Sequence, residues 1–347
     1  MSEKYRGDRL DKQLDTLISL YRMMVRIRAF EDAAEQASQG GVSVYGQAAS
    51  GTAKVRGPLH LSTGQEAVSA GVCAHLSPTD YLTSTHRGHG HTLAKGADLT
   101  RMMCELYGKA DGFNGGRGGS MHIADFSVGM LGANGVVGAG LPIAVGAAHA
   151  QKLQKRSDIT VSFFGDGAIN RGPFLESLNW AQVYQLPVLF VCEDNQWSAT
   201  TATHAMSAGD GAAARAQSIG IKAVEVDGND VMAVYTAAKD LIAEIRLGQG
   251  PRLLHAHTYR IKGHVSVDKA AYRDEAQVEQ AKQRDPIVHA RTRYLATPGS
   301  DVAVLEKIDT EAKAEVSQAM AYADACRAPA PEDAYTHIQT TGAGQWH

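Results

Sequence analysis

The chain has 347 residues, of which 44% are hydrophobic and 20% are charged, and its formal net charge is −3. This composition is that of a globular protein, argues against disorder and gives no reason to expect nucleic acid or anionic lipid as a main partner. The polar N-terminus lacks the apolar core of a signal peptide, no apolar run approaches the roughly 20 residues of a membrane span, and the four cysteines form no CxxC pair. We therefore expect reduced thiols and a cytoplasmic protein without nucleic-acid or membrane partners.

The N-terminal part, residues 1–60, is predicted to hold one helix and one long surface loop. Apolar residues recur at helical spacing from Leu14 and predict an amphipathic helix that runs to about Ala37. The glycine-, alanine- and serine-rich stretch 38–54 predicts the loop. A second helix is predicted at 63–76, with Ser62 or Thr63 as its cap and Glu66 in its first turn.

Residues 61–270 alternate between predicted strands and helices. The glycine-dense stretch 111–140 cannot be regular helix or strand throughout, because its glycines favour turns and close backbone approach. A buried alanine-rich helix at 141–151 is expected to follow it. The predicted strands are 159–164, 188–192 and 253–258, and the other predicted helices are 173–184 and 231–247. This order is typical of an α/β fold with a mostly parallel sheet and helices on both faces.

The remaining segment, residues 271–347, is charged and predicted to be a helical C-terminal extension. Its candidate helices are 277–284 and 301–325. We expect this extension to pack on the outside of the same domain or on a partner.

Two polar clusters follow the first two predicted strands directly. Asp166 lies between Gly165 and Gly167, and Asn195 and Trp197 follow the next strand. A carboxylate, an amide carbonyl and the Trp197 backbone carbonyl are hard oxygen ligands that suit Mg²⁺ bridging a diphosphate. The glycines allow the turn to bend and its N–H groups to face phosphate. The alternative is a pair of ordinary turns that contain Gly, Asp and Asn.

These clusters resemble the thiamine-diphosphate motif, in which Gly-Asp-Gly is followed about thirty residues later by Asn-Asn. The surroundings resemble the α subunits of the pyruvate, branched-chain 2-oxo acid and acetoin dehydrogenases. The segments that carry the resemblance are Gly64–Ala67, Thr85–Gly90, Gly116–His122, Gly135–Ala139 and Tyr259–His264. The resemblance implies a thiamine-diphosphate-binding fold. One departure is Asp194, where the family usually has Asn; the second position of the motif, Asn195, is intact.

The resemblance implies a set of site residues. Mg²⁺ would be bound by Asp166, Asn195 and Trp197. His264 would be catalytic, with a near-neutral pKa that suits proton transfer. The cofactor would be bound by His86, Arg87, Gly135, Val137, Asp166, Gly167, Ala168, Asn195, Arg260 and His264.

Other readings of these segments stay open. His86, His89 and His91 have the makings of a zinc site, although no fourth ligand of suitable spacing stands out. Residues 135–138 are alternatively a packing loop, and as a dinucleotide-binding pattern they are weak. His255 and His257 share one strand face and are interpreted as structural.

Two residues of the glycine-rich stretch stay weaker candidates. His122 ends the glycine-rich loop of the family pattern, and Arg117 in that loop serves either a phosphate or a partner chain. After His264, the position that carries a regulatory phosphorylated serine in animal pyruvate dehydrogenases is Val265. That switch is therefore absent from this chain.

The resemblance also implies an activity and partners. The chain would be the α subunit of an α₂β₂ heterotetramer that uses thiamine diphosphate and Mg²⁺ and docks on a lipoyl-bearing dihydrolipoyl acyltransferase core. The segment from His86 to His91 is closest to the acetoin dehydrogenase type, so C–C cleavage of acetoin with transfer of the acyl unit is expected. The alternatives are oxidative decarboxylation of pyruvate or a branched-chain 2-oxo acid, a homologue that has lost catalysis, and a nicotinamide-dependent dehydrogenase.

Overall fold

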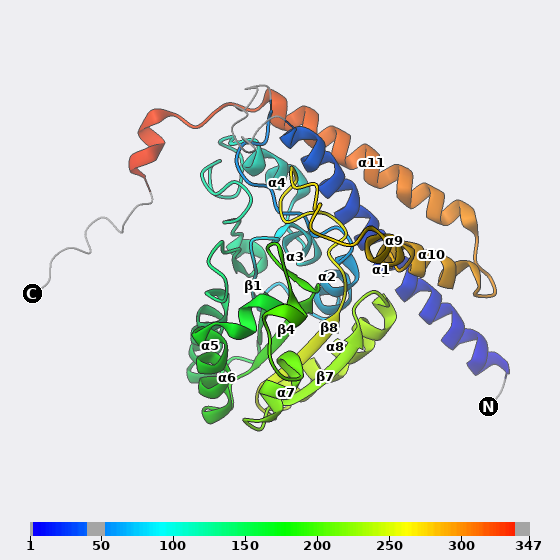
Figure 1. Cartoon of the computed structure of the whole chain (residues 1–347). Helices are drawn as coiled ribbons and strands as arrows, with labels where there is room; N and C mark the ends of the chain where they lie inside the picture. Colours follow the sequence, from blue (N-terminus) through cyan, green and yellow to red (C-terminus); the bar gives the residue numbers. More distant parts are fainter. Residues whose placement is uncertain (1–2, 40–52, 337–347) are drawn as a thin grey trace, which may run out of the picture.

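A six-stranded parallel sheet forms the centre of the computed structural model, which describes residues 3–39 and 53–336 (Figure 1). The strand order is β2-β1-β3-β4-β8-β7, and each neighbouring pair is parallel. The bounds are β1 Tyr81–Thr83, β2 Met130–Gly132, β3 Thr160–Gly165, β4 Val188–Asp194, β7 Lys222–Asp227 and β8 Arg252–His257. A separate antiparallel pair, β5 (Trp197–Ser198) and β6 (Thr201–Ala202), follows β4. The expected α/β architecture with a parallel sheet is confirmed.

The three strands predicted from apolar runs are β3, β4 and β8, which form the buried middle of the sheet. Their side chains alternate between the two faces, as the period of two requires. Val161 and Phe163 pack into one apolar layer, whereas Phe164 packs into the layer on the other face. Both faces are therefore covered, which explains why these strands read as continuous apolar runs.

Helices cover each face of the sheet. One face packs against α5 (Gly140–Leu153), α6 (Gly172–Val183) and α7 (Gly211–Gln217). The opposite face packs against α2 (Glu66–Cys73) and α8 (Val231–Arg246). The prediction that the alanine-rich helix is buried was only half right, because Ile143 is 49% exposed and Ala150 is exposed as well.

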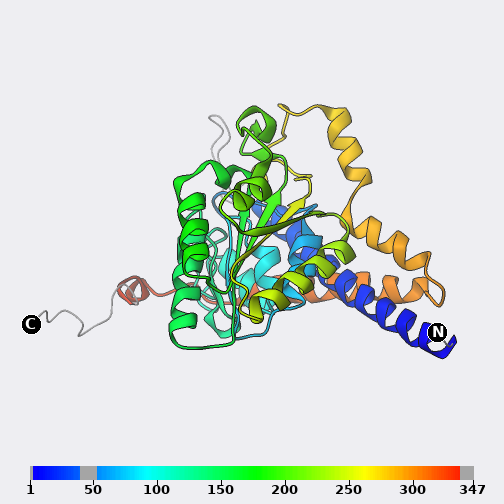
Figure 2. The same ribbon diagram turned by 90° about the horizontal axis from the view of Figure 1, so that it is seen from below.

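An outer layer of long helices packs over α2. The first helix, α1 (Glu3–Ser38), begins well before the predicted start, and it lies beside α11 (Val302–Ala325) in both views (Figures 1 and 2). Its buried residues, from Leu17 through Met24 to Phe30, recur at helical spacing. The other helices are α3 (His89–Ala94), α4 (Leu99–Leu106), α9 (Glu275–Gln283) and α10 (Pro286–Leu295), and short 3₁₀ turns lie at 126–128, 166–170, 203–205 and 331–335.

Two details differ from the sequence-based expectations. The residue at the N-cap of α2 is Gln65, and its side chain makes no capping hydrogen bond. The Ser62 hydroxyl instead donates to buried Glu31 at 2.6 Å. The predicted cap, Ser62 or Thr63, was therefore wrong. Most of the predicted 38–54 loop lies outside the described residues. The division into regions 1–60, 61–270 and 271–347 stays a prediction. Within the described part of the chain, no helix combines the length and the hydropathy that crossing a bilayer requires.

Candidate active site

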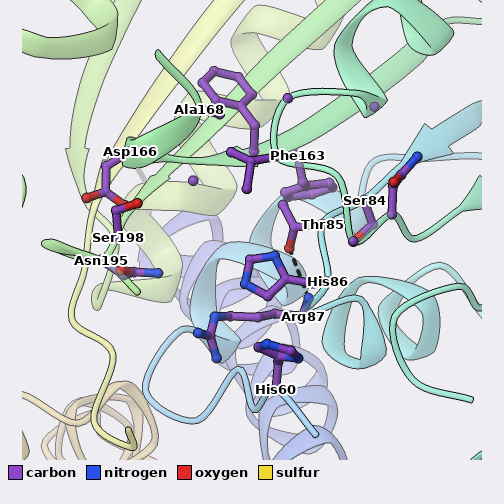
Figure 3. Close-up of a pocket in the computed structure, with 18 of the residues that line it drawn as sticks. His60, Ser84, Thr85, His86, Arg87, Phe163, Asp166, Ala168, Asn195 and Ser198 are labelled. Carbon is purple, nitrogen blue, oxygen red and sulfur yellow. Dashed lines mark hydrogen bonds between the residues drawn. The ribbon is translucent and has the colours of Figure 1, made fainter. Parts of the chain in front are cut away.

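A cavity of about 220 Å³ opens at the carboxyl ends of the strands. Parallel sheets place their ligand sites at this edge, because loops from neighbouring strands converge there. Every cofactor-binding and metal-binding residue predicted from the sequence lines this cavity: His86, Arg87, Gly135, Val137, Asp166, Gly167, Ala168, Asn195, Trp197, Arg260 and His264. Figure 3 shows Asp166 and Asn195 on one side of it, and His86, Arg87 and His60 on the other.

The oxygen side of the cavity is built by the ends of β3 and β4. Asp166 follows β3 directly and is 2% exposed, and Asn195 follows β4 and is 6% exposed. The Asn195 side-chain amide donates to Gln65 Oε1 at 3.0 Å, and its carbonyl accepts from the Trp197 N–H at 3.1 Å. The side chain is therefore held from both ends. Asp166 accepts a hydrogen bond from the Thr203 hydroxyl.

Burial raises the pKa of Asp166 to about 7, and the negative charge of Asp194 adds to the rise. Arg260 and nearby backbone N–H groups oppose it. An anionic oxygen that is costly to keep charged in the free protein is stabilised when a cation binds beside it. The donor set of carboxylate, amide carbonyl and backbone carbonyl consists of hard oxygens only, and it fits Mg²⁺.

Two buried arginines supply positive charge to the cavity. Arg87 is 4% exposed and donates to the carbonyl oxygens of Leu61 at 2.8 Å and His264 at 3.0 Å. Arg260 is 1% exposed and donates to the Ala199 carbonyl at 2.7 Å, while its Nε has no hydrogen-bond partner among the described residues. Burial lowers the pKa of Arg87 to about 9 and that of Arg260 to about 10, so both remain cationic at neutral pH. A buried guanidinium with an unused donor fits an anionic ligand such as a diphosphate.

Three imidazoles meet at one wall of the cavity: His60 from the segment before α2, His86 from the loop after β1, and His264 from the loop after β8. His60 lies against His86 and His264, with ring centroids 4.6 and 4.8 Å away. Burial and the charge of Arg87 lower the pKa of His60 to about 3 and that of His86 to about 2. These two rings are therefore uncharged at neutral pH.

The protonation state of His264 differs from the one expected from the sequence. Burial, Arg87 and Arg260 lower its pKa to about 4, so the near-neutral value expected from the sequence is wrong for the free chain. The physical reason is its position beside two guanidinium groups, which disfavour a third positive charge. Arg87 Nη2 lies 3.2 Å from His264 Nδ1, which must accept because the guanidinium only donates. The proton of neutral His264 is therefore on Nε2.

The zinc reading of the histidine segment is wrong in the described structure. His89 lies against Glu31 and Ser120, and His91 lies between Ser84 and Glu193 and stacks on Phe163. Neither lines the cavity with His86. Within the described residues, these three side chains form no group that converges on one point.

The turn at Gly167 shows how closely the protein wraps this end of the cavity. A Cβ atom on Gly167 would lie 2.3 Å from Ser198 Oγ, so a larger residue here would require the Ser198 side chain to move. At the opposite rim, Val136 and Val137 are 62% and 44% exposed. The cavity is thus tightly built at the Asp166 end and open along residues 135–138.

Several lining residues were missed from the sequence. His60, Ser84, Thr85, Phe163 and Ser198 all line the cavity. Thr85 lies in a segment that carries the family resemblance but was not named as a site residue, and Phe163 lies within the buried strand β3. No local pattern marks the other three, and only the fold places them here.

The weaker candidates lie elsewhere. Arg117 donates to the carbonyl oxygens of Asn114, Asp333 and Thr336, and neither it nor His122 lines the cavity.

Comparison with known proteins identifies the family. The profile of the family described as "Dehydrogenase E1 component" matches residues 42–332. The acetoin:2,6-dichlorophenolindophenol oxidoreductase α subunit of Bacillus subtilis is 42% identical over 315 residues, covering 90% of each chain. The protein of the same name from Cupriavidus necator is 40% identical over 332 residues, covering 95% of each. The pyruvate dehydrogenase E1 α subunit of Zymomonas mobilis is 36% identical over 337 residues, covering 96% of this chain and 90% of that one. The chain therefore belongs to the dehydrogenase E1 component family of thiamine-diphosphate-dependent enzymes.

Proposed function

We propose that this chain is the α subunit of a thiamine-diphosphate-dependent dehydrogenase that cleaves acetoin and holds the diphosphate end of its cofactor through Mg²⁺. The observation that carries the proposal is the convergence of all the expected cofactor and metal residues on one cavity at the carboxyl ends of the strands. The acetoin-named relatives, at 40–42% identity over nearly the whole chain, support the substrate.

In this proposal, Asp166, Asn195 and the Trp197 carbonyl bind Mg²⁺, and Arg87 and Arg260 offset the charge of the diphosphate. The all-oxygen donor set supports the metal assignment. The unused Nε of Arg260 supports the anion assignment. The Thr203 hydroxyl donates to Oδ2 of Asp166, and Oδ1 is the oxygen proposed to face the ion.

When bound, thiamine diphosphate supplies a nucleophilic carbon that adds to the substrate carbonyl. His264 is proposed to hold a proton at Nε2 for the reacting oxygen. The diphosphate would offset the positive field of Arg87 and Arg260, which lowers the pKa of His264 in the free chain. Cofactor binding is therefore expected to raise that pKa toward the range in which imidazole exchanges protons.

The substrate proposal rests on charge as well as on likeness. His60 and His86 are uncharged at neutral pH and offer hydrogen bonds without a counter-charge. Acetoin is a neutral hydroxyketone that needs only hydrogen bonds, whereas a 2-oxo acid brings a carboxylate that would have to share Arg87 and Arg260 with the diphosphate. His89 and His91 do not line the cavity, so His86 is the histidine of the His86–His91 segment that is placed to contact substrate.

A β subunit is proposed to complete the site, in an α₂β₂ heterotetramer on a lipoyl-bearing acyltransferase core. Among the described residues that line the cavity there is no glutamate, and in this family the glutamate that activates the cofactor belongs to the β subunit. The exposed rim at Val136 and Val137 is a suitable place for a partner surface. The "subunit alpha" in the relatives' names agrees with such a division of labour.

The test is reduction of 2,6-dichlorophenolindophenol by the chain reconstituted with its β subunit, thiamine diphosphate and Mg²⁺. Acetoin, pyruvate and branched-chain 2-oxo acids are offered in parallel, and CO₂ release is measured. Dye reduction with acetoin and without CO₂ supports the proposal. Preference for a 2-oxo acid with CO₂ release overturns the substrate; silence on all substrates together with loss of cofactor binding favours a homologue without catalysis.

A further inference from the structure

A second cluster of ligand-type side chains lies beside the cofactor cavity, and the proposed function does not use it. Asp194 ends β4, and His255 and His257 lie on the adjacent strand β8. His255 Nε2 is 3.1 Å and His257 Nδ1 is 3.5 Å from the same oxygen, Asp194 Oδ2. The period of two along β8 puts both imidazoles on one face, and the parallel register brings Asp194 to them.

The spacing of these atoms is that of a metal site. One ligand atom from each of the three residues lies within 4.8 Å of the other two. Ligand atoms about 2 Å from a tetrahedral zinc ion are themselves about 3–4 Å apart. The two Asp194–histidine distances already fall in this range, so only a small side-chain shift is needed to close the site.

The ring nitrogens and the carboxylate oxygen that face away from the proposed ion also have neighbours that hold the side chains in place. His257 Nε2 lies 2.7 Å from Glu225 Oε2, which leaves Nδ1 as the nitrogen that faces Asp194. His255 is 3% exposed, and its Nδ1 lies 3.9 Å from the same Glu225 oxygen and has no hydrogen-bond partner in the described part of the chain. Asp194 Oδ1 accepts from the Gln196 N–H at 3.3 Å. A carboxylate behind a metal-binding histidine is the usual second layer of such sites, because it fixes the ring and its tautomer.

The cluster faces open space. Asp194, His255 and His257 line a cavity of about 370 Å³, which is separate from the cofactor cavity although Asp166 and Trp197 border both. Open space next to three protein ligands leaves room for water or another small ligand to complete the coordination.

We propose that Asp194, His255 and His257 form a second metal site, which takes a borderline divalent cation such as Zn²⁺ and is distinct from the Mg²⁺ site at Asp166. Two imidazoles and one carboxylate suit zinc, whereas Mg²⁺ prefers oxygen ligands only. The ion ties the end of β4 to the end of β8. It also offsets the negative charge that Asp194 places beside Asp166.

The proposal is tested by calorimetric titration of the full-length chain, without a histidine tag, with ZnCl₂ after chelator treatment and dialysis. The buffer contains no Mg²⁺, thiamine diphosphate or substrate, so the result is independent of the proposed function, and failure of either leaves the other standing. One Zn²⁺ per chain is expected. Co²⁺ at the same site is expected to give visible absorption that ZnCl₂ displaces.

The variants decide which residues bind. His255→Gln is expected to abolish stoichiometric binding, and Asp194→Asn, which is nearly isosteric, to weaken it by at least tenfold. Glu225→Gln removes only the outer carboxylate and should weaken binding by about 10–100-fold. If His255→Gln fails to fold by circular dichroism, the other two variants decide.

His60→Gln is the matched control, because His60, His86 and His264 form the other converging histidine group of the described chain. It should bind Zn²⁺ like the wild type. No stoichiometric binding by the wild type overturns the proposal. So does binding that survives Asp194→Asn and His255→Gln but is lost in His60→Gln, because the ion would then occupy the cofactor cavity.

Discussion

The buried charge of Asp166 should make the metal-free protein less stable above about pH 7, where this carboxylate is ionised and can bind a cation. Burial and Asp194 raise the pKa of Asp166 from 3.8 to about 7. One pKa unit corresponds to about 1.4 kcal/mol, so ionising this carboxylate in the folded chain costs roughly 4 kcal/mol relative to the unfolded chain. The side chain is 2% exposed, so solvent screening reduces this figure little.

The sign follows from proton binding. Between pH 4 and pH 7, the folded state holds a proton on Asp166 that the unfolded state has lost. The contribution of this group therefore lowers the free energy of unfolding as pH rises from about 4 to about 7, and then levels off. Asp166→Asn removes this penalty. The variant should be more stable than the wild type by about 2–4 kcal/mol at pH 8, and the difference should vanish toward pH 4.

The assay is urea unfolding of both proteins in EDTA at several pH values between 4 and 8, followed by circular dichroism. Asp210→Asn is the control, because Asp210 is an exposed aspartate on the neighbouring loop; its profile should follow that of the wild type. The same Asp166→Asn protein should lose Mg²⁺-dependent binding of thiamine diphosphate. A stability difference that does not change with pH would refute the electrostatic argument, and retained cofactor binding would refute the metal assignment.

Three further outcomes are expected. Glu105→Gln should lower the free energy of unfolding by roughly 2–4 kcal/mol in a denaturant titration. The reason is that the buried carboxylate accepts hydrogen bonds from backbone N–H groups of the glycine-rich loop 114–119. An unchanged denaturation midpoint would contradict this role. Gly167→Ala should weaken cofactor binding by about 1–3 kcal/mol, because its Cβ would lie 2.3 Å from Ser198 Oγ, and adding Ser198→Gly should restore it if the clash is the cause. His264→Ala should lower turnover by about 10²–10⁴-fold while α/β assembly, measured by gel filtration, is unchanged; near-normal turnover would remove His264 from the mechanism.

The sequence predicts a strand most reliably where the strand's own residues form an apolar run. The buried strands β3, β4 and β8 read as apolar runs because both of their faces are covered. Strands β1 and β2 span only three residues each and are too short to show a period, and β7 at the edge of the sheet has no fully buried residue. These strands were missed because pairing with neighbours, rather than local composition, makes them strands.

The same distinction holds in the site. The cofactor residues were named from a resemblance carried by local motifs, and each of them lines the cavity. His60 carries no such motif, and its place beside His86 and His264 depends on contacts between distant segments. The lowered pKa of His264 has the same origin, because Arg87 is far from it in sequence.

The sequence by itself determined the α/β class, the order of the main helices and strands, and the chemistry of the motif that follows β3 and β4. Only the tertiary structure decided what Asp194 faces. His255 and His257 were interpreted from the sequence as structural. His255 hydrogen-bonds to Asp194, and His257 lies 3.5 Å from the same oxygen; both keep the pKa of the Asp194 carboxyl below the usual range despite its burial. The reason is physical: periodicity along one strand is local, whereas the parallel register that sets β8 beside β4 is fixed by packing across the whole sheet.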